Sequence, residues 1–313
     1  MFLRALSDAL LARGAALLDA GSDRRALASL SLAARLSPGR AECLCLAAEA
    51  ASRLGERDLA ARYCERALRV DPALAPMHQL LMRLFLGGEE YFRVLERIHR
   101  ELRPKTYVET GVDKGDSIRL ALPGTRAIGI DPRPSIAFDP GPTTRIFAQT
   151  SDEFFARPDL DALLGGLPVD LAFIDGMHHF EVALRDFMHL ERLCHRDATI
   201  LIHDCFPHDR RTAQRERSVE FWSGDVWRLI VLLKKYRPDL SIHTIATPPT
   251  GLAVVRRLDP RSGYLAAHLE RLTREFLALD YAYLDRDRAG KLNLVPNDWE
   301  AIRRLIGEVP TSP

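Results

Sequence analysis

The chain has 313 residues, room for one large domain or two smaller ones, and its 47% hydrophobic and 28% charged residues are a globular composition. Its 44 Lys and Arg balance 43 Asp and Glu, and a net charge of +1 excludes binding to nucleic acid or an acidic membrane through overall charge. We therefore expect local sites to determine the function.

The N-terminal segment does not resemble a secretory signal. It reads MFLRALSDALLARGAALLDAG and is interrupted by Arg4, Asp8 and Arg13. No later apolar run reaches the roughly 20 residues that span a bilayer. The five cysteines form an odd set without a CxxC pair, which is typical of reduced thiols. These features predict a cytoplasmic protein with no membrane partner.

Residues 1–88 contain an internal repeat. A shift of 34 residues superposes small and helix-ending residues: Gly14 on Ala48, Gly21 on Gly55, Ala26 on Ala60, Ala33 on Ala67 and Pro38 on Pro72. This period is that of tetratricopeptide repeats, in which small residues let two antiparallel helices approach closely and proline ends the second helix. Two repeats are few for a free-standing solenoid, so we expect this module to bind a protein partner or to self-associate.

From about residue 89 the pattern changes to an alternation of short β-rich runs with helical stretches. A helix in 90–104 ends at a proline, and seven runs follow: TYVET, RAIGID, RIFAQ, VDLAFID, ATILIHD, SIHTIA and LAVVRRL. Alternation of this kind predicts an α/β fold, a doubly wound and mostly parallel Rossmann-like sheet of seven strands with helices on both faces. We assign residues 89–260 to this domain and 261–313 to a C-terminal helical extension.

Polar or acidic residues stand at the carboxyl end of five consecutive predicted strands. They are Glu109, Gly111 and Gly115 after the first, Asp131 at the second, Thr150 to Asp152 after the third, Asp175 at the fourth, and His203 and Asp204 at the fifth. Ligands of open parallel sheets bind beyond these ends. The sequence therefore predicts one binding crevice there.

The glycine loop after the first strand favours one cofactor class over another. A dinucleotide site needs GxGxxG before a helix, whereas this loop has a GxxxG spacing and carries Asp113, which would repel a pyrophosphate. S-adenosylmethionine has no phosphate, and its sulfonium and ammonium groups are attracted by Glu109 and Asp113. We expect this donor, with Asp131 accepting hydrogen bonds from its ribose and a helix following Gly115.

The motifs VETGVDKGDS, AIGID, FIDGMHHFEVALRDF and ILIHD resemble those of the class I S-adenosylmethionine-dependent methyltransferases, especially small-molecule O-methyltransferases of the macrocin and catechol type. The resemblance covers about residues 90–260. It implies an antiparallel last strand, Glu109 and Gly111 around the amino-acid end of the donor, and Ser151 with Asp152 near the adenine. It also implies a small-molecule or glycan-like acceptor.

In the catechol-type relatives a divalent cation, Mg²⁺ or another, lies between the ends of the fourth and fifth strands. The matching ligands here are Asp175, His203 and Asp204, and the histidine departs from the usual amide. Two roles stay open for His203: ligand of a softer cation, or general base acting on a hydroxyl held by Asp175. By the same resemblance His178 points into the crevice as a further catalytic residue.

Two other hypotheses remain beside methyl transfer. One is a nucleoside-binding scaffold without turnover, recruited through the helical repeats, and the other is an NAD-dependent oxidoreductase. The segment from Gly224 to Trp227 is either a lid whose tryptophans cover the acceptor or part of an amphipathic helix that buries Trp222 and Trp227.

Overall fold

The computed structural model describes residues 2–307, which form two compact units. Within the described residues, the first contains 2–87 together with 217–222, and the second contains 88–216 and 223–307. Each unit is described by itself below. Among the described residues, none of the helices is both long enough and apolar enough to cross a bilayer.

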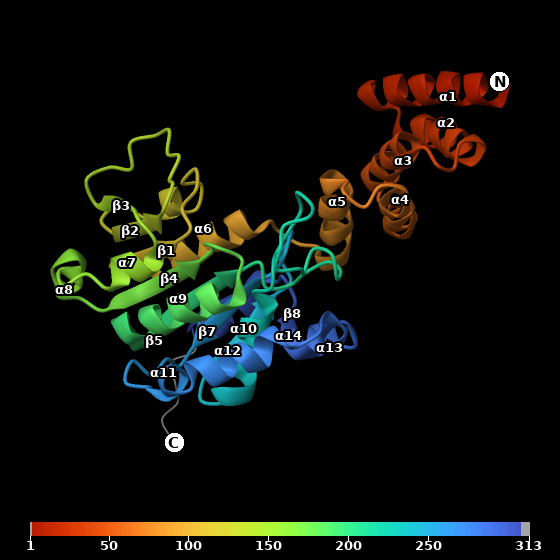
Figure 1. Ribbon diagram of the computed structural model, residues 1–313. Helices are drawn as coiled ribbons and strands as arrows, with labels where there is room; N and C mark the ends of the chain where they lie inside the picture. Colours follow the sequence, from red (N-terminus) through yellow and green to blue (C-terminus); the bar gives the residue numbers. More distant parts are fainter. Residues whose placement is uncertain (1, 308–313) are drawn as a thin grey trace. The chain divides into compact units, whose positions relative to one another are not determined.

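The first unit is built from five helices (Figure 1): α1 (Phe2–Asp19), α2 (Asp23–Leu36), α3 (Ala41–Arg53), α4 (Arg57–Val70) and α5 (Ala75–Leu86). Two tight turns between helices lie 34 residues apart, at Gly21 and Gly55, and both glycines have a positive φ. Small residues bring the helices together: a Cβ at Gly14 would lie 2.5 Å from Cγ of Leu30. The predicted helical module is therefore present.

The second unit is an α/β domain with one mixed sheet. Its strands are β1 (Thr106–Thr110), β2 (Arg126–Asp131), β3 (Thr144–Ala148), β4 (Val169–Ile174), β5 (Cys194–His203), β6 (Ser241–Ile245), β7 (Leu252–Arg256) and β8 (Leu294–Val295). Their order is β3-β2-β1-β4-β5-β7-β6-β8, and β7 runs antiparallel to both neighbours. The predicted number of seven is wrong by one, because the two-residue β8 from the C-terminal extension pairs with β6.

Helices cover both faces of this sheet. The α-helices of the unit are α6 (Tyr91–Leu102), α7 (Ser151–Phe155), α8 (Leu160–Leu164), α9 (Phe180–Leu193), α10 (Trp227–Tyr236), α11 (Tyr264–Ala267), α12 (Leu269–Leu277), α13 (Tyr281–Asp285), α14 (Arg288–Leu292) and α15 (Trp299–Gly307). α9 and α10 pack on one face (Figure 1). On the other, apolar residues of α6 and α15 form one core with Tyr107, Leu171 and Phe173 of the central strands.

The helix expected after the glycine loop is reduced to a 3₁₀ turn, Ile118–Leu120. Pro123 and Gly124 follow three residues later, and a proline removes a backbone donor while disfavouring the helical conformation of the residue before it. Trp227 is buried in the first turn of α10, so of the two alternatives for this segment the buried helix is the one observed.

Candidate functional site

A cavity of about 810 Å³ opens at the carboxyl ends of the parallel strands. It brings together most of the site residues predicted from the sequence: Gly111, Asp131, Ser151, Asp152, Asp175, His178, His203 and Asp204. Glu109 and Gly115 do not contribute to the lining formed by the described residues. One crevice therefore collects polar groups from five strand ends.

The two glycines of the first loop serve the packing of the backbone. Gly111 has a φ of +87°, and a Cβ there would lie 2.1 Å from the carbonyl oxygen of Asp175. Gly115 has a φ of +81°, and its Cβ would lie 2.8 Å from the ring of Phe138. Because L side chains rarely adopt such φ values, glycine is required at both positions to close the loop against its neighbours.

Glu109 is fully buried beneath this loop. Its carboxyl group accepts hydrogen bonds from the hydroxyls of Tyr107 and Ser117, each at 2.5 Å. Burial raises the pKa of Glu109 to about 8, although both hydrogen bonds act to lower it. The side chain is thus a buried acid beneath the first loop.

Asp131 connects the end of β2 to the first loop. Its Oδ2 accepts the backbone N–H groups of Val112 and Asp113, both at 3.0 Å, and its Oδ1 accepts that of Arg133 at 2.7 Å. A carboxylate offers about four lone-pair positions, so this carboxylate can accept further hydrogen bonds from a ligand.

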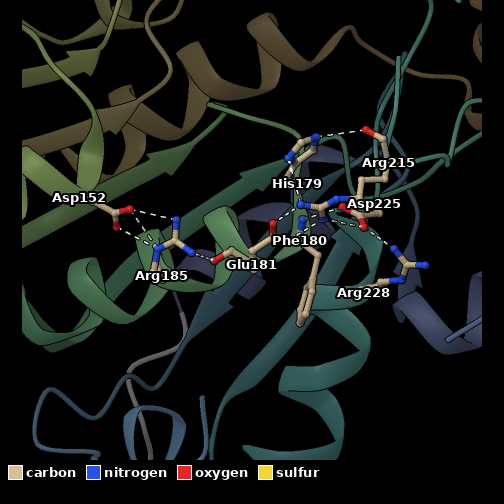
Figure 2. A network of polar contacts seen from close by, with 8 residues as sticks. All are labelled: Asp152, His179, Phe180, Glu181, Arg185, Arg215, Asp225 and Arg228. Atoms are coloured by element: carbon tan, nitrogen blue, oxygen red, sulfur yellow. Dashed lines mark hydrogen bonds and ion pairs between the residues drawn. The ribbon is translucent and has the colours of Figure 1, made fainter. Parts of the chain in front are cut away.

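Ser151 and Asp152 open α7, and Thr150 caps this helix with a capping box. Asp152 forms a bidentate ion pair with Arg185 of α9, with Nε–Oδ1 and Nη2–Oδ2 distances of 2.9 Å (Figure 2). The adjacent Asp186 also lines the cavity but is only 2% exposed, and its Oδ1 has no hydrogen-bond partner among the residues that the structure describes. Burial raises the pKa of Asp186 to about 6.

Two acids and two histidines meet at the ends of β4 and β5. His203 Nδ1 lies 3.0 Å from Asp175 Oδ1 and 3.1 Å from Asp204 Oδ2, and His178 Nε2 lies 2.9 Å from the same Asp204 oxygen. His178 Nε2 is 4.0 Å from Asp175 Oδ1. The four side chains form one contiguous polar group, which we call the acid–histidine cluster.

The protonation of this cluster follows from burial and mutual attraction. Burial lowers the pKa of His203, but the carboxylates of Asp204 and Asp175 outweigh it and raise that pKa to about 10. Burial likewise opposes the charge of His178, whose pKa is nevertheless raised by Asp204. The two carboxyl groups thus favour the imidazolium form of His203.

Donor atoms in the cluster fit a divalent cation. Asp175, His178 and Asp204 can each offer one ligand atom, and these atoms lie within 4.8 Å of one another. Two carboxylates with one imidazole suit a cation of intermediate softness. His203, expected as a ligand or as a general base, has Nδ1 3.0 and 3.1 Å from oxygens of Asp175 and Asp204 and Nε2 3.3 Å from the hydroxyl of Thr250.

Sequence reasoning missed Tyr91 and Thr250 beside His203. The ring of Tyr91, in the first turn of α6, stacks on the imidazole of His203 with centroids 3.9 Å apart and an interplanar angle of 24°. Both residues are far from the five strand ends in the sequence. The only sequence signal was the aromatic pair of Tyr91 and Phe92 before the first strand, and both of these line the cavity.

Comparisons with known proteins agree with the kind of domain that the sequence predicts. Residues 108–205 match the family model described as a methyltransferase domain. This match, over less than a third of the chain, agrees with the enzyme class predicted from the sequence, a class I S-adenosylmethionine-dependent methyltransferase. Comparison with curated proteins gives no significant match.

Among solved structures, similar chains are O-methyltransferases. One is TomG from Streptomyces achromogenes, involved in tomaymycin synthesis and solved with S-adenosylmethionine. It shares 15% identity over 54% of this chain and 80% of that one, with a TM-score of 0.41. Another, from Bacillus cereus with S-adenosylhomocysteine, shares 13% identity over 53% and 79%, with a TM-score of 0.40.

Proposed function

We propose that the protein transfers a methyl group from S-adenosylmethionine to a hydroxyl oxygen of a small-molecule or carbohydrate-like acceptor. The observation that supports this most is the shared cavity, in which Asp131 lies at one strand end and the acid–histidine cluster at two others. The donor would bind over β1 to β3, and the acceptor over β4 and β5.

The charges of the cavity favour this donor over NAD. Asp113, Asp116 and Asp131 line the end near the first loop together with Lys114 and Arg133. The acids outnumber the basic residues there, so a sulfonium with its ammonium group is favoured over a pyrophosphate. Asp131 would accept the ribose hydroxyls, and Ser151 with Asp152 would lie near the adenine.

In the reaction the acceptor oxygen forms a bond to the methyl carbon while the carbon–sulfur bond breaks, and S-adenosylhomocysteine leaves. The acceptor hydroxyl must also lose its proton, which would pass to solvent water. A divalent cation held by Asp175, His178 and Asp204 would lower the pKa of that hydroxyl. His203 would keep both carboxylates in place through Nδ1, and Tyr91 would shield its imidazole from water.

The helical unit is proposed to bind a protein partner or a second copy of the chain. Large apolar side chains are exposed on it, among them Phe2, Leu3, Leu32 and Phe85. Exposed apolar groups of this size are typical of surfaces that associate.

S-adenosylhomocysteine is expected to stabilise the purified protein. At a hundred times its dissociation constant a ligand contributes about 2.7 kcal/mol, and for a domain of this size that corresponds to roughly 5 to 10 °C in melting temperature. Differential scanning fluorimetry with and without the ligand measures it. A shift with NAD and none with S-adenosylhomocysteine would overturn the proposed function.

Replacing Asp131 by Ala is expected to weaken donor binding at least about tenfold, because hydrogen bonds to a charged group contribute about 1.5 to 3 kcal/mol each. Turnover at saturating donor should be retained, since the acid–histidine cluster is left intact. Isothermal titration with S-adenosylhomocysteine measures the affinity. Asp139→Ala is the matched control, because Asp139 is an exposed acid of the following loop that accepts only the N–H of Gly141. Equal affinities of the two variants would contradict the role of Asp131.

A further inference from the structure

A buried carboxylate outside the acid–histidine cluster holds the segment that carries His178. Asp225 belongs to the connection between β5 and α10 and is fully buried. Its Oδ1 accepts the backbone N–H of Phe180 at 2.6 Å, and its own backbone N–H donates to the carbonyl oxygen of His178 at 3.1 Å. Figure 2 shows Asp225 beside the first turn of α9. His178 to Phe180 are thus held from both ends.

This contact replaces an ordinary helix cap. The N-cap residue of α9 is His179, whose side chain makes no capping hydrogen bond. The first N–H groups of a helix lack partners within the helix, and a negative charge near them is favourable. Asp225 supplies both the acceptor and the charge from a residue 45 positions away along the chain.

The backbone before Asp225 lies directly against His178. Gly224 has a φ of +62°, and a Cβ at this position would lie 2.0 Å from the carbonyl oxygen of His178 and 2.6 Å from its Cβ. Only glycine allows so close an approach. The two segments are therefore in direct backbone contact at the site.

Two arginines balance the buried charge of Asp225. Its Oδ2 forms an ion pair with Arg228 in the first turn of α10, and Arg215 Nη1 lies 3.6 Å away. Arg215 also pairs with Glu181 in the first turn of α9 (Figure 2). A buried carboxylate is tolerated only when it is paired in this way. The pairing fixes Asp225 relative to both helices.

His178 needs such support more than the rest of the cluster. His203 ends β5 and Asp204 follows it directly, while the backbone N–H of Asp175 is bonded to Thr110 of β1 at 2.8 Å. His178 lies three residues beyond Asp175, in the loop between β4 and α9. We propose that Asp225 is a positioning residue that holds this loop so that His178 faces Asp204. The catalytic meaning of this role rests on the proposed function.

The test compares Asp225→Ala, Asp225→Asn and a matched control in otherwise intact protein. The first readout is the ¹H–¹⁵N spectrum of the His178 imidazole, which reports the hydrogen bond between Nε2 and Asp204. The second is Mn²⁺ affinity, measured by electron paramagnetic resonance. We expect Asp225→Ala to lose the hydrogen-bonded signature and to weaken Mn²⁺ binding by about 10- to 100-fold, as for other groups that orient metal ligands.

The conservative variant Asp225→Asn keeps an acceptor for the N–H of Phe180, so it should retain the wild-type His178 spectrum. The control is Glu191→Ala, which breaks another buried ion pair of α9, with Arg237, at Nη1–Oε2 and Nη2–Oε1 distances of 2.7 and 2.8 Å. This variant should lower the melting temperature without changing the His178 spectrum or the Mn²⁺ affinity. If Asp225→Ala fails to fold, the double variant Asp225→Ala with Arg228→Ala leaves no unpaired guanidinium and takes its place.

Unchanged His178 signals in the Asp225→Ala or double variant, or an equal change in Glu191→Ala, would overturn the proposal. Binding of S-adenosylhomocysteine is followed in parallel and should remain within threefold, about 0.65 kcal/mol. A wild-type protein that binds neither Mn²⁺ nor S-adenosylhomocysteine would overturn the proposed function alone, since the His178 spectrum still decides whether Asp225 positions this side chain.

Discussion

Replacement of Asp175 by Asn is expected to lower turnover by at least about 100-fold, the lower range for a group that assists proton removal or holds the reacting oxygen. The change preserves the volume of the side chain and removes its charge. His203 Nδ1, now 3.0 Å from Asp175 Oδ1, would keep a hydrogen-bond acceptor but lose one of the two carboxylates that raise its pKa. The acceptor hydroxyl would lose the group proposed to orient it.

Donor binding should change little in this variant, because Asp131, Ser151 and Asp152 lie at other strand ends. Methyl transfer from labelled donor measures turnover, and isothermal titration with S-adenosylhomocysteine measures binding. Asp170→Asn is the matched control: Asp170 lies on the same strand but accepts the backbone N–H groups of Lys105 and Thr106. If Asp175→Asn kept wild-type turnover, the catalytic role proposed for Asp175 at the end of β4 would be wrong, whatever the methyl donor is.

The strands and their shared edge could be predicted because the pattern that encodes them is local. Buried parallel strands are continuous apolar runs, and their carboxyl ends must meet at one edge, so the sequence alone predicts that Asp131, Asp175 and Asp204 lie together. The two-residue β8 has no such pattern. It pairs only because Leu294 and Val295 meet Thr244 and Ile245 across the sheet edge.

The direction of the Glu109 side chain could not be predicted from the strand pattern. The sequence predicts that Glu109 lies at the donor, and this stays a prediction. Alternate residues of a strand face the same side, so Glu109 shares its side of the sheet with Tyr107. Tyr107 belongs to the core formed with α6 and α15, and its hydroxyl binds Glu109. The strand end was predictable, whereas the direction of the side chain depended on which face those helices cover.

The role of Asp225 could not be predicted from the sequence, for a different reason. Its partners Phe180 and Arg215 come from α9 and from the connection after β5, and no periodic pattern links them. Sequence reasoning weighed this segment only as a lid or as a buried helix. A lone Asp before a helix is common, and its function as a cap for another helix depends on long-range packing.

Replacement of Glu109 by Gln is expected to stabilise the protein at alkaline pH. The folded state raises the pKa of this carboxyl group from 4.5 to about 8. The folded protein therefore holds the proton more tightly than the unfolded chain does. The stability that the protonated group contributes is fully present below pH 4.5 and is lost as the pH rises through 8.

A difference of 3.5 between the two pKa values corresponds to a loss of up to about 5 kcal/mol, at 1.36 kcal/mol per unit. Glutamine cannot ionise, and its amide can still exchange hydrogen bonds with the hydroxyls of Tyr107 and Ser117. Melting temperatures measured between pH 5 and 9 should therefore nearly coincide for both proteins at pH 5, diverge steadily in favour of Glu109→Gln as the pH rises, and differ by a constant amount above about pH 8. Glu270→Gln, at an exposed position of α12, should follow the wild type throughout. If Glu109→Gln were instead less stable at every pH, Glu109 would be ionised in the folded state, and a negative charge would face the amino-acid end of the donor as the family resemblance implies.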